Sequence, residues 1–321
     1  MALRLAVATG VVLTALAGAN GAAAAPLPGL LALVGDATIA TGVRYAARDS
    51  AGNSLDTLKI VGASSQLYVG VYHSDVGGRY VVKVATSKDV LTWKYAADLD
   101  TDASQPTVQK LANAAFLLVY EKESAGQHWL RFRYYKNLSA LLAGSYQQQA
   151  DGPPLLSPIE GTPSITSVSL SPDILHSAIA VGLHYNTAAG DREATGTLTN
   201  FKTWTDSTSA QLNSLFTSLG LQGNFGDRDT GAVQGTSLEL VEGQSLAGDW
   251  GSWRVYDYDT QSQTLSQVPV RTAGGSVAFG NPTLTAITAP NGKAAVVVTY
   301  FVFSEGSAPG EAGELIFYKT L

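Results

Sequence analysis

The chain repeats Gln105-Pro-Thr-Val108 as Thr162-Pro-Ser-Ile165 and again as Asn281-Pro-Thr-Leu284. Each copy is followed by an apolar run and then by a second strand-like run. Two further units share this plan without the proline, and they begin at Asp56 and Asp227. The five unit starts lie 49, 57, 65 and 54 residues apart. A repeat of this length, with several strands in each unit, predicts an all-β fold: a five-bladed β-propeller with four-stranded antiparallel blades.

In such a propeller, the first strand of each blade lines a central pit, so the residues that open the repeats are candidates for an active site. These are Asp56, Gln105, Glu160 with Thr162, Asp227 and Asn281. Because they differ from blade to blade, they favour one asymmetric site over the repeated motif of a lectin. We also expect an N-terminal strand, from the segment before Asp56, to pair with the last blade and close the ring.

The first 25 residues are typical of a secretory signal peptide: Arg4, the apolar stretch Leu5–Leu16, then the small-residue segment Gly18–Ala25. We therefore expect a secreted, extracellular protein whose residues 26–321 form a single propeller domain. No later segment resembles a membrane span. The chain has no cysteine, which excludes disulfides, thiolate metal sites and a cysteine nucleophile. Its formal net charge is −6 without a basic block, so nucleic acid and anionic membranes are not expected partners.

Three segments resemble secreted five-bladed propeller glycoside hydrolases of family 43, which are related to families 32, 62 and 117. The turn Ser87-Lys-Asp-Val-Leu-Thr-Trp93 resembles their Ser-x-Asp-Leu-x-x-Trp turn. We expect Asp89 to cap this turn and Trp93 to pack between blades. Ile159-Glu-Gly-Thr-Pro-Ser-Ile165 resembles the Glu-Gly-Pro segment that carries the general acid, and Asp56 stands where the family has its catalytic base.

The resemblance implies Asp56 as the base and Glu160 as the acid of an inverting glycoside hydrolase. The chain departs from the family pattern at three points. Thr57 replaces the proline after the base, Glu160 lies three residues before its proline instead of two, and Thr107 falls at the third carboxylate. Asp102 and Asp227 are the candidates for that third acid, and Asp227 is the one we expect at the site. A structural role, as a turn cap or a loop carboxylate, is the alternative for Asp56 and Glu160.

Glycoside hydrolysis needs one carboxyl to protonate the leaving oxygen and another to activate water or attack the sugar. The acid must have a raised pKa, through burial or a neighbouring carboxylate. The residues expected to bind the substrate are Arg228, His184, His73, Gln105, Asn281 and Trp250. The histidines are also alternative acids, as in family 117, and aromatic rings such as Trp250 stack on sugar faces.

Two other functions stay open on the sequence alone. One is a non-catalytic carbohydrate-binding propeller, and the other is a polysaccharide lyase that would use His184, Tyr185 and Arg192 beside a uronate. No Gly-x-Ser-x-Gly motif supports a serine hydrolase. We expect a carbohydrate substrate, a monomer and no cofactor, with a structural Ca²⁺ in the central channel as the one metal left open.

Overall fold

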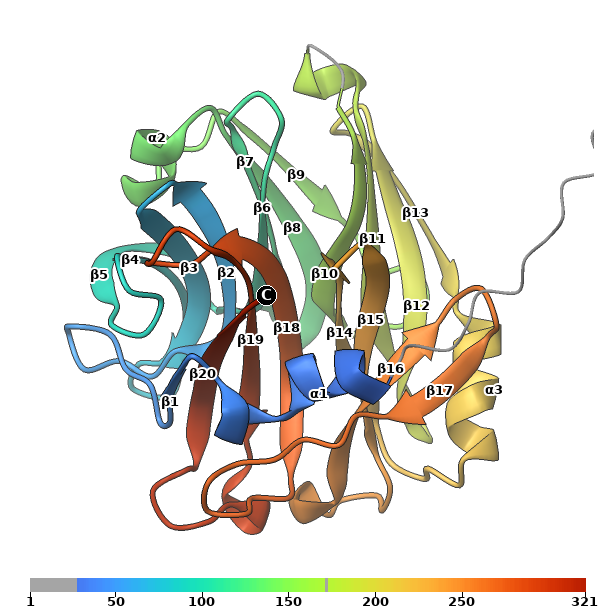
Figure 1. The fold of residues 1–321 in the computed structure, drawn as a ribbon. Coiled ribbons are helices and arrows are strands. Elements are labelled where there is room, and N and C mark those ends of the chain that lie inside the picture. The colour runs from blue at the N-terminus through green and yellow to red at the C-terminus, as the bar shows by residue number, and fades with distance from the viewer. Residues whose placement is uncertain (1–27, 171–172) are drawn as a thin grey trace, which may run out of the picture.

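The structure is a computed structural model that describes residues 28–170 and 173–321, so the signal peptide expected at 1–25 lies outside the described residues. Within these ranges, twenty strands form five four-stranded antiparallel sheets (Figure 1). The first two sheets are β2 (Asp56–Ser64), β3 (Leu67–Asp75), β4 (Tyr80–Ser87) and β5 (Lys94–Thr101), then β6 (Ala103–Lys110), β7 (Phe116–Ser124), β8 (Gln127–Tyr135) and β9 (Gln148–Gly152). The next two are β10 (Glu160–Ser169), β11 (Ala178–Thr187), β12 (Gly190–Thr199) and β13 (Thr203–Thr208), then β14 (Phe225–Val233), β15 (Thr236–Gln244), β16 (Trp253–Asp259) and β17 (Thr264–Gln267). The fifth contains β18 (Phe279–Thr288), β19 (Ala294–Val302), β20 (Gly313–Thr320) and β1 (Gly42–Arg44).

The strand order confirms the predicted five-bladed propeller. In each sheet, strands that follow one another in the chain are neighbours, and the first strands contact one another in the cyclic order β2, β6, β10, β14, β18 and back to β2. The fifth sheet takes its outermost strand from the other end of the chain, because β1 pairs antiparallel with β20, with Val43 opposite Phe317. The five inner strands therefore surround a central channel.

The hydrophobic core lies between the blades. Strand β3 is buried continuously from Tyr68 to Ser74, and β19 is buried over most of its length, because the middle of a blade has a neighbouring blade on each face. One apolar cluster joins the first and last blades through Leu58, Ile287 and Ile316. Removal of this apolar surface from water is the main force that stacks the blades.

The turn from Ser87 to Trp93 has the predicted structural role. Asp89 Oδ1 accepts hydrogen bonds from the backbone N–H groups of Leu91 at 2.9 Å and Thr92 at 2.6 Å. The Trp93 side chain is buried in the cluster between the first and last blades. Asp89 thus caps the turn and Trp93 packs between blades, as the sequence predicted.

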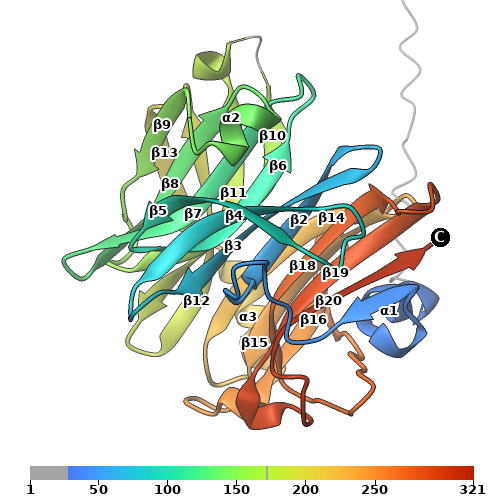
Figure 2. The same ribbon diagram turned by 90° about the vertical axis from the view of Figure 1, so that its left-hand side faces the viewer.

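Three α-helices of the described chain lie outside the blades. Helix α1 (Pro28–Gly35) contacts β19 beside the last blade (Figures 1 and 2), while α2 (Leu138–Leu142) and α3 (Ala210–Ser218) follow β8 and β13. Short 3₁₀ helices also occur in the described chain: η1 (Ala37–Ile39), η2 (Ile174–His176), η3 (Trp250–Ser252) and η4 (Ser304–Gly306). In the described ranges, none of these helices has the length and apolar character that a membrane crossing requires.

Candidate active site

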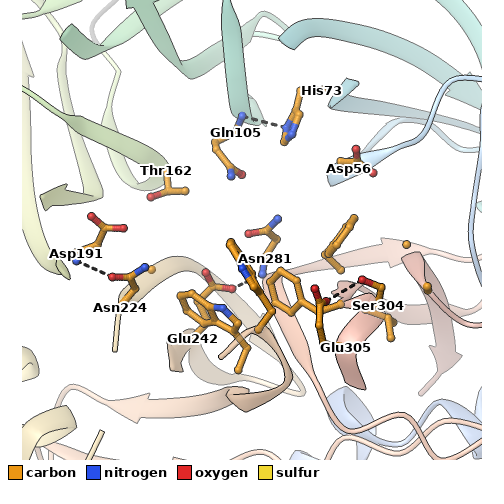
Figure 3. A pocket seen from close by; sticks show the side chains of 18 of the residues that line it. Asp56, His73, Gln105, Thr162, Asp191, Asn224, Glu242, Asn281, Ser304 and Glu305 are labelled. Carbon is orange, nitrogen blue, oxygen red and sulfur yellow. Dashed lines mark hydrogen bonds between the residues drawn. The ribbon is translucent and has the colours of Figure 1, made fainter. Parts of the chain in front are cut away.

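A pocket of about 560 Å³ opens where the five inner strands begin (Figure 3). All five first strands contribute to its wall, through Asp56, Gln105, Thr162, Gly226 and Asn281. The other described residues that line it are His73, Tyr80, His184, Asp191, Asn224, Glu242, Trp250, Trp253, Phe301, Val302, Phe303, Ser304, Glu305, Ala312 and Gly313. Four of the residues named as repeat openings, Asp56, Gln105, Thr162 and Asn281, therefore line one pocket, whereas Glu160 and Asp227 are not among its described lining residues.

Each first strand carries a bulge at this end. The strand pairing shifts register after Asp56, Ser104, Gly161, Phe225 and Gly280. Four residues that follow these points, Thr57, Gln105, Thr162 and Asn281, have φ values of 44° to 55°. This left-handed conformation is costly for residues with a side chain, so the surrounding structure must hold it. Bulges of this kind redirect side chains next to binding sites.

Hydrogen bonds from one blade to the next hold these bulges, and we call each of them a clip. His73 Nδ1 accepts from the backbone N–H of Gln105 at 3.2 Å, and Glu121 Oε2 accepts from that of Thr162 at 3.2 Å. Glu242 Oε2 accepts from the N–H of Asn281 in the same way. The same contact explains why a glycine stands before Thr162, because a Cβ at Gly161 would overlap the Glu121 carboxylate. The side chains of His73, Glu121 and Glu242 thus join neighbouring blades.

Asp56 combines burial with access to the pocket. Its carboxyl accepts a hydrogen bond from Ser54 Oγ at 2.8 Å and lines the pocket wall. Burial raises the pKa of Asp56 above its ordinary value; the Ser54 hydrogen bond and Arg48 lower this pKa, and Asp75 raises it further. A carboxylate of raised pKa is a stronger base than an exposed one, which suits proton abstraction near neutral pH.

Both predicted histidines lie in the pocket wall. Burial lowers the pKa of His73 to about 4. The Gln105 N–H donates to His73 Nδ1, so this nitrogen carries no proton and the neutral ring is protonated at Nε2. His184 Nδ1 forms a hydrogen bond with the Thr162 hydroxyl. The structure therefore brings His73, His184, Gln105 and Asn281 together with Asp56.

The structure places Glu160 elsewhere. Its Oε1 accepts hydrogen bonds from the backbone N–H groups of Leu156 at 2.5 Å and Ser157 at 3.2 Å. Burial, with Asp206 nearby, raises the pKa of Glu160 to about 7. Such a pKa would suit a general acid, yet Glu160 is not among the described residues that line the pocket. Glu160 thus has the contacts of the structural alternative, a loop carboxylate that accepts hydrogen bonds from backbone N–H groups.

Arg228 also points away from the pocket. It is 4% exposed, and its guanidinium donates to the carbonyl of Ala194 and lies 3.4 Å from both Glu193 and Glu239. These contacts place it between the third and fourth blades. Asp227 belongs to β14 at the bulge, but its side chain lies outside what the structure describes. Of the Gly226–Asp229 segment, Gly226 reaches the pocket wall.

Aromatic rings form one side of the pocket. Trp250 and Trp253 have centroids 6.4 Å apart, and Phe303 lies 5.3 Å from Trp250 and 5.9 Å from Trp253. Trp250 is 50% exposed, whereas Trp253 is buried. The predicted role of Trp250 therefore has a suitable geometry: an exposed ring, supported from behind, beside the polar groups of the pit.

Sequence reasoning missed several members of the pocket. Glu242 shares its repeat position with His73, but it was not among the residues expected to form the site. Asp191 is the second residue of β12, Asn224 lies in the loop before β14, and the Asp191 N–H donates to Asn224 Oδ1 at 3.0 Å (Figure 3). Nothing in their local sequence distinguishes them from ordinary turn residues.

A lysine lies in the channel below the pocket. Lys59 Nζ donates to Leu284 O at 2.9 Å and forms a buried ion pair with Asp229. Calcium requires six to eight oxygen ligands, and an ammonium group in their midst would repel it. Among the described residues, no cluster of three or more His, Asp or Glu side chains could hold a metal. The ammonium group of Lys59 thus supplies the positive charge beside Asp229 in this part of the channel.

No protein-family model matches the chain, and no curated protein matches it. Similar solved structures include a thermostable family-43 glycoside hydrolase, with 10% identity, TM-score 0.53 and coverage of 87% of this chain and 93% of that one. The family-43 endo-arabinanase from Bacillus licheniformis has 12% identity and a TM-score of 0.52 over 85% and 96% of the two chains. The α-L-arabinofuranosidase from Podospora anserina, solved with cellotriose, has 11% identity and a TM-score of 0.51 over 86% and 95%. At these identities the likeness is one of fold: the chain shares its overall fold with these three solved structures.

Proposed function

We propose that the protein is a secreted, monomeric glycoside hydrolase that cleaves a plant or microbial poly- or oligosaccharide in the central pocket. The observation that carries this proposal is the position of Asp56: a largely buried carboxyl of raised pKa that lines the same pocket as the aromatic rings and several polar side chains. Three proteins of similar structure support the proposal: one is described as a glycoside hydrolase, one as an arabinanase and one as an arabinofuranosidase.

We assign the base to Asp56, which would activate the attacking water. For the acid we favour Glu242 over Glu160, because Glu242 lines the pocket on the fourth blade, which is not adjacent to the blade of Asp56. Carboxyls from non-adjacent blades suit the wider spacing of an inverting mechanism. Asp227 remains the sequence-based candidate for a third acid.

The pocket favours a neutral sugar. Its wall contains Asp56, Asp191, Glu242 and Glu305, and no Lys or Arg is among the described lining residues. A uronate carboxylate would meet these acids without a basic partner, so the lining argues against a lyase for uronates. Amide groups of Gln105, Asn224 and Asn281 can exchange hydrogen bonds with sugar hydroxyls.

The test is a screen of the purified protein against arabinan, xylan, galactan, uronate-containing polysaccharides and aryl glycosides. Release of reducing sugar that Asp56→Asn abolishes supports the proposal. An unsaturated product with ultraviolet absorbance would support a lyase instead. Binding without turnover, unaffected by Asp56→Asn, would support a lectin.

A further inference from the structure

The junction of the last blade with the first differs from the other clips in the described chain. Those clips come from the second strand of a blade, through His73, Glu121 and Glu242. At the corresponding place in β19 stands Phe301, which pairs with Gly280 and lines the pocket. The clip there comes instead from Glu314, which lies opposite Phe301 on β20.

Glu314 holds the bulge that follows Asp56. Its Oε1 accepts a hydrogen bond from the backbone N–H of Leu58 at 3.3 Å. The carbonyl of Leu58 accepts from the hydroxyls of Thr299 at 2.8 Å and Thr283 at 3.1 Å. Both backbone polar groups of Leu58 are therefore fixed, and Asp56 lies two residues before Leu58.

The surroundings of Glu314 favour its neutral form. The residue is 1% exposed, and its Oε2 has no hydrogen-bond partner among the described residues. An ionised carboxylate is costly in such a place. Burial, and then the charge of Asp56, raise the pKa of Glu314 well above its ordinary value, while hydrogen bonds from the backbone N–H groups of Leu58 and Thr57 lower it.

Building on the proposed role of Asp56, we propose that Glu314 is its positioning residue: it fixes the bulge of Asp56 and keeps its own proton so that Asp56 can ionise. The charged groups that act on this pair come from β2, β3 and the segment before β2. The charge of Asp56 acts on Glu314, and the charges of Arg48 and Asp75 act on Asp56. Two interacting carboxyls titrate as a pair, so Asp56 ionises first and Glu314 at higher pH.

The experiment is a carbon-detected NMR titration of the Asp56 carboxyl in the wild type, in Glu314→Gln and in Glu121→Gln. Glutamine at 314 keeps an oxygen for the Leu58 N–H but cannot ionise. Glu121→Gln alters an equivalent clip at another junction. We expect the Asp56 titration curve of the wild type to show two inflections. The upper inflection should be lost in Glu314→Gln, and both inflections should remain in Glu121→Gln. A single inflection in the wild type, or an upper step that survives Glu314→Gln, would overturn the proposal.

This titration does not depend on turnover, so it separates failure of this proposal from failure of the proposed function. The wild-type curve tests the coupling even where a variant fails to fold. Where the screen finds a substrate, the alkaline limb of kcat/KM should move to higher pH in Glu314→Gln. An unchanged alkaline limb in a folded variant would contradict the role of the Glu314 proton.

Discussion

His73 Nδ1 accepts a hydrogen bond from the backbone N–H of Gln105, and this contact joins the first blade to the second at the wall of the pocket. The bond requires an unprotonated Nδ1, so it persists while the ring is neutral. The same contact supports the left-handed backbone of Gln105. Protonation of His73, a side chain that lines the pocket, would therefore break a contact between two blades.

The pH dependence of stability should reveal this clip. Burial lowers the pKa of His73 from 6.5 in the unfolded chain to about 4 in the folded protein. Between these values the unfolded state binds more protons, so the stabilisation is complete above about 6.5 and declines as pH falls toward 4. His73→Gln, whose amide oxygen can accept the same bond, should lack this component. Urea unfolding of both proteins across this window tests it, and parallel pH profiles would contradict the assignment.

The Lys59–Asp229 pair should be important for stability because it is buried in the central channel. Lys59→Met alone leaves an uncompensated carboxylate in the channel and should destabilise the protein by about 3–5 kcal/mol. The double variant with Asp229→Asn should recover part of this loss. Denaturant unfolding of both variants measures the difference. A single variant as stable as the double would show that Asp229 does not need its cation.

Trp93 should contribute strongly to the packing of the first blade against the last. Trp93→Ala leaves a large cavity in that cluster and should cost about 3–5 kcal/mol. Trp93→Phe should cost less, because it retains part of the ring. Thermal unfolding of the two variants provides the check, and equal losses would argue against a packing role.

Trp250 should act on substrate binding more than on the chemical step. Trp250→Ala should raise KM about two- to tenfold, because an aromatic contact contributes roughly 0.5–1.5 kcal/mol. Trp250→Phe, which keeps a stacking face, should have a smaller effect. Steady-state kinetics on an oligosaccharide found in the screen separate kcat from KM. A loss confined to kcat would place Trp250 outside the binding surface.

The sequence predicted the fold well because the propeller is encoded by repetition. The repeat openings gave the five blades and brought Asp56, Gln105 and Asn281 to the pit. The direction of individual side chains was less accessible. Glu160 and Gly161 are adjacent, but adjacent strand residues face opposite ways, and Gly161 faces the clip of Glu121. Arg228 turned between blades because Glu193 and Glu239, distant in sequence, lie there.

The most direct test of the central claim compares Asp56→Asn, Glu242→Gln and Glu160→Gln for release of reducing sugar, with the exposed Asp173→Asn as a control. We predict that the first two lower kcat by about 10²- to 10⁴-fold, the usual contribution of a general acid or base. Glu160→Gln and Asp173→Asn should stay near wild type. Full activity of a folded Asp56→Asn variant would contradict the account, and loss confined to Glu160→Gln would move the site away from this pocket.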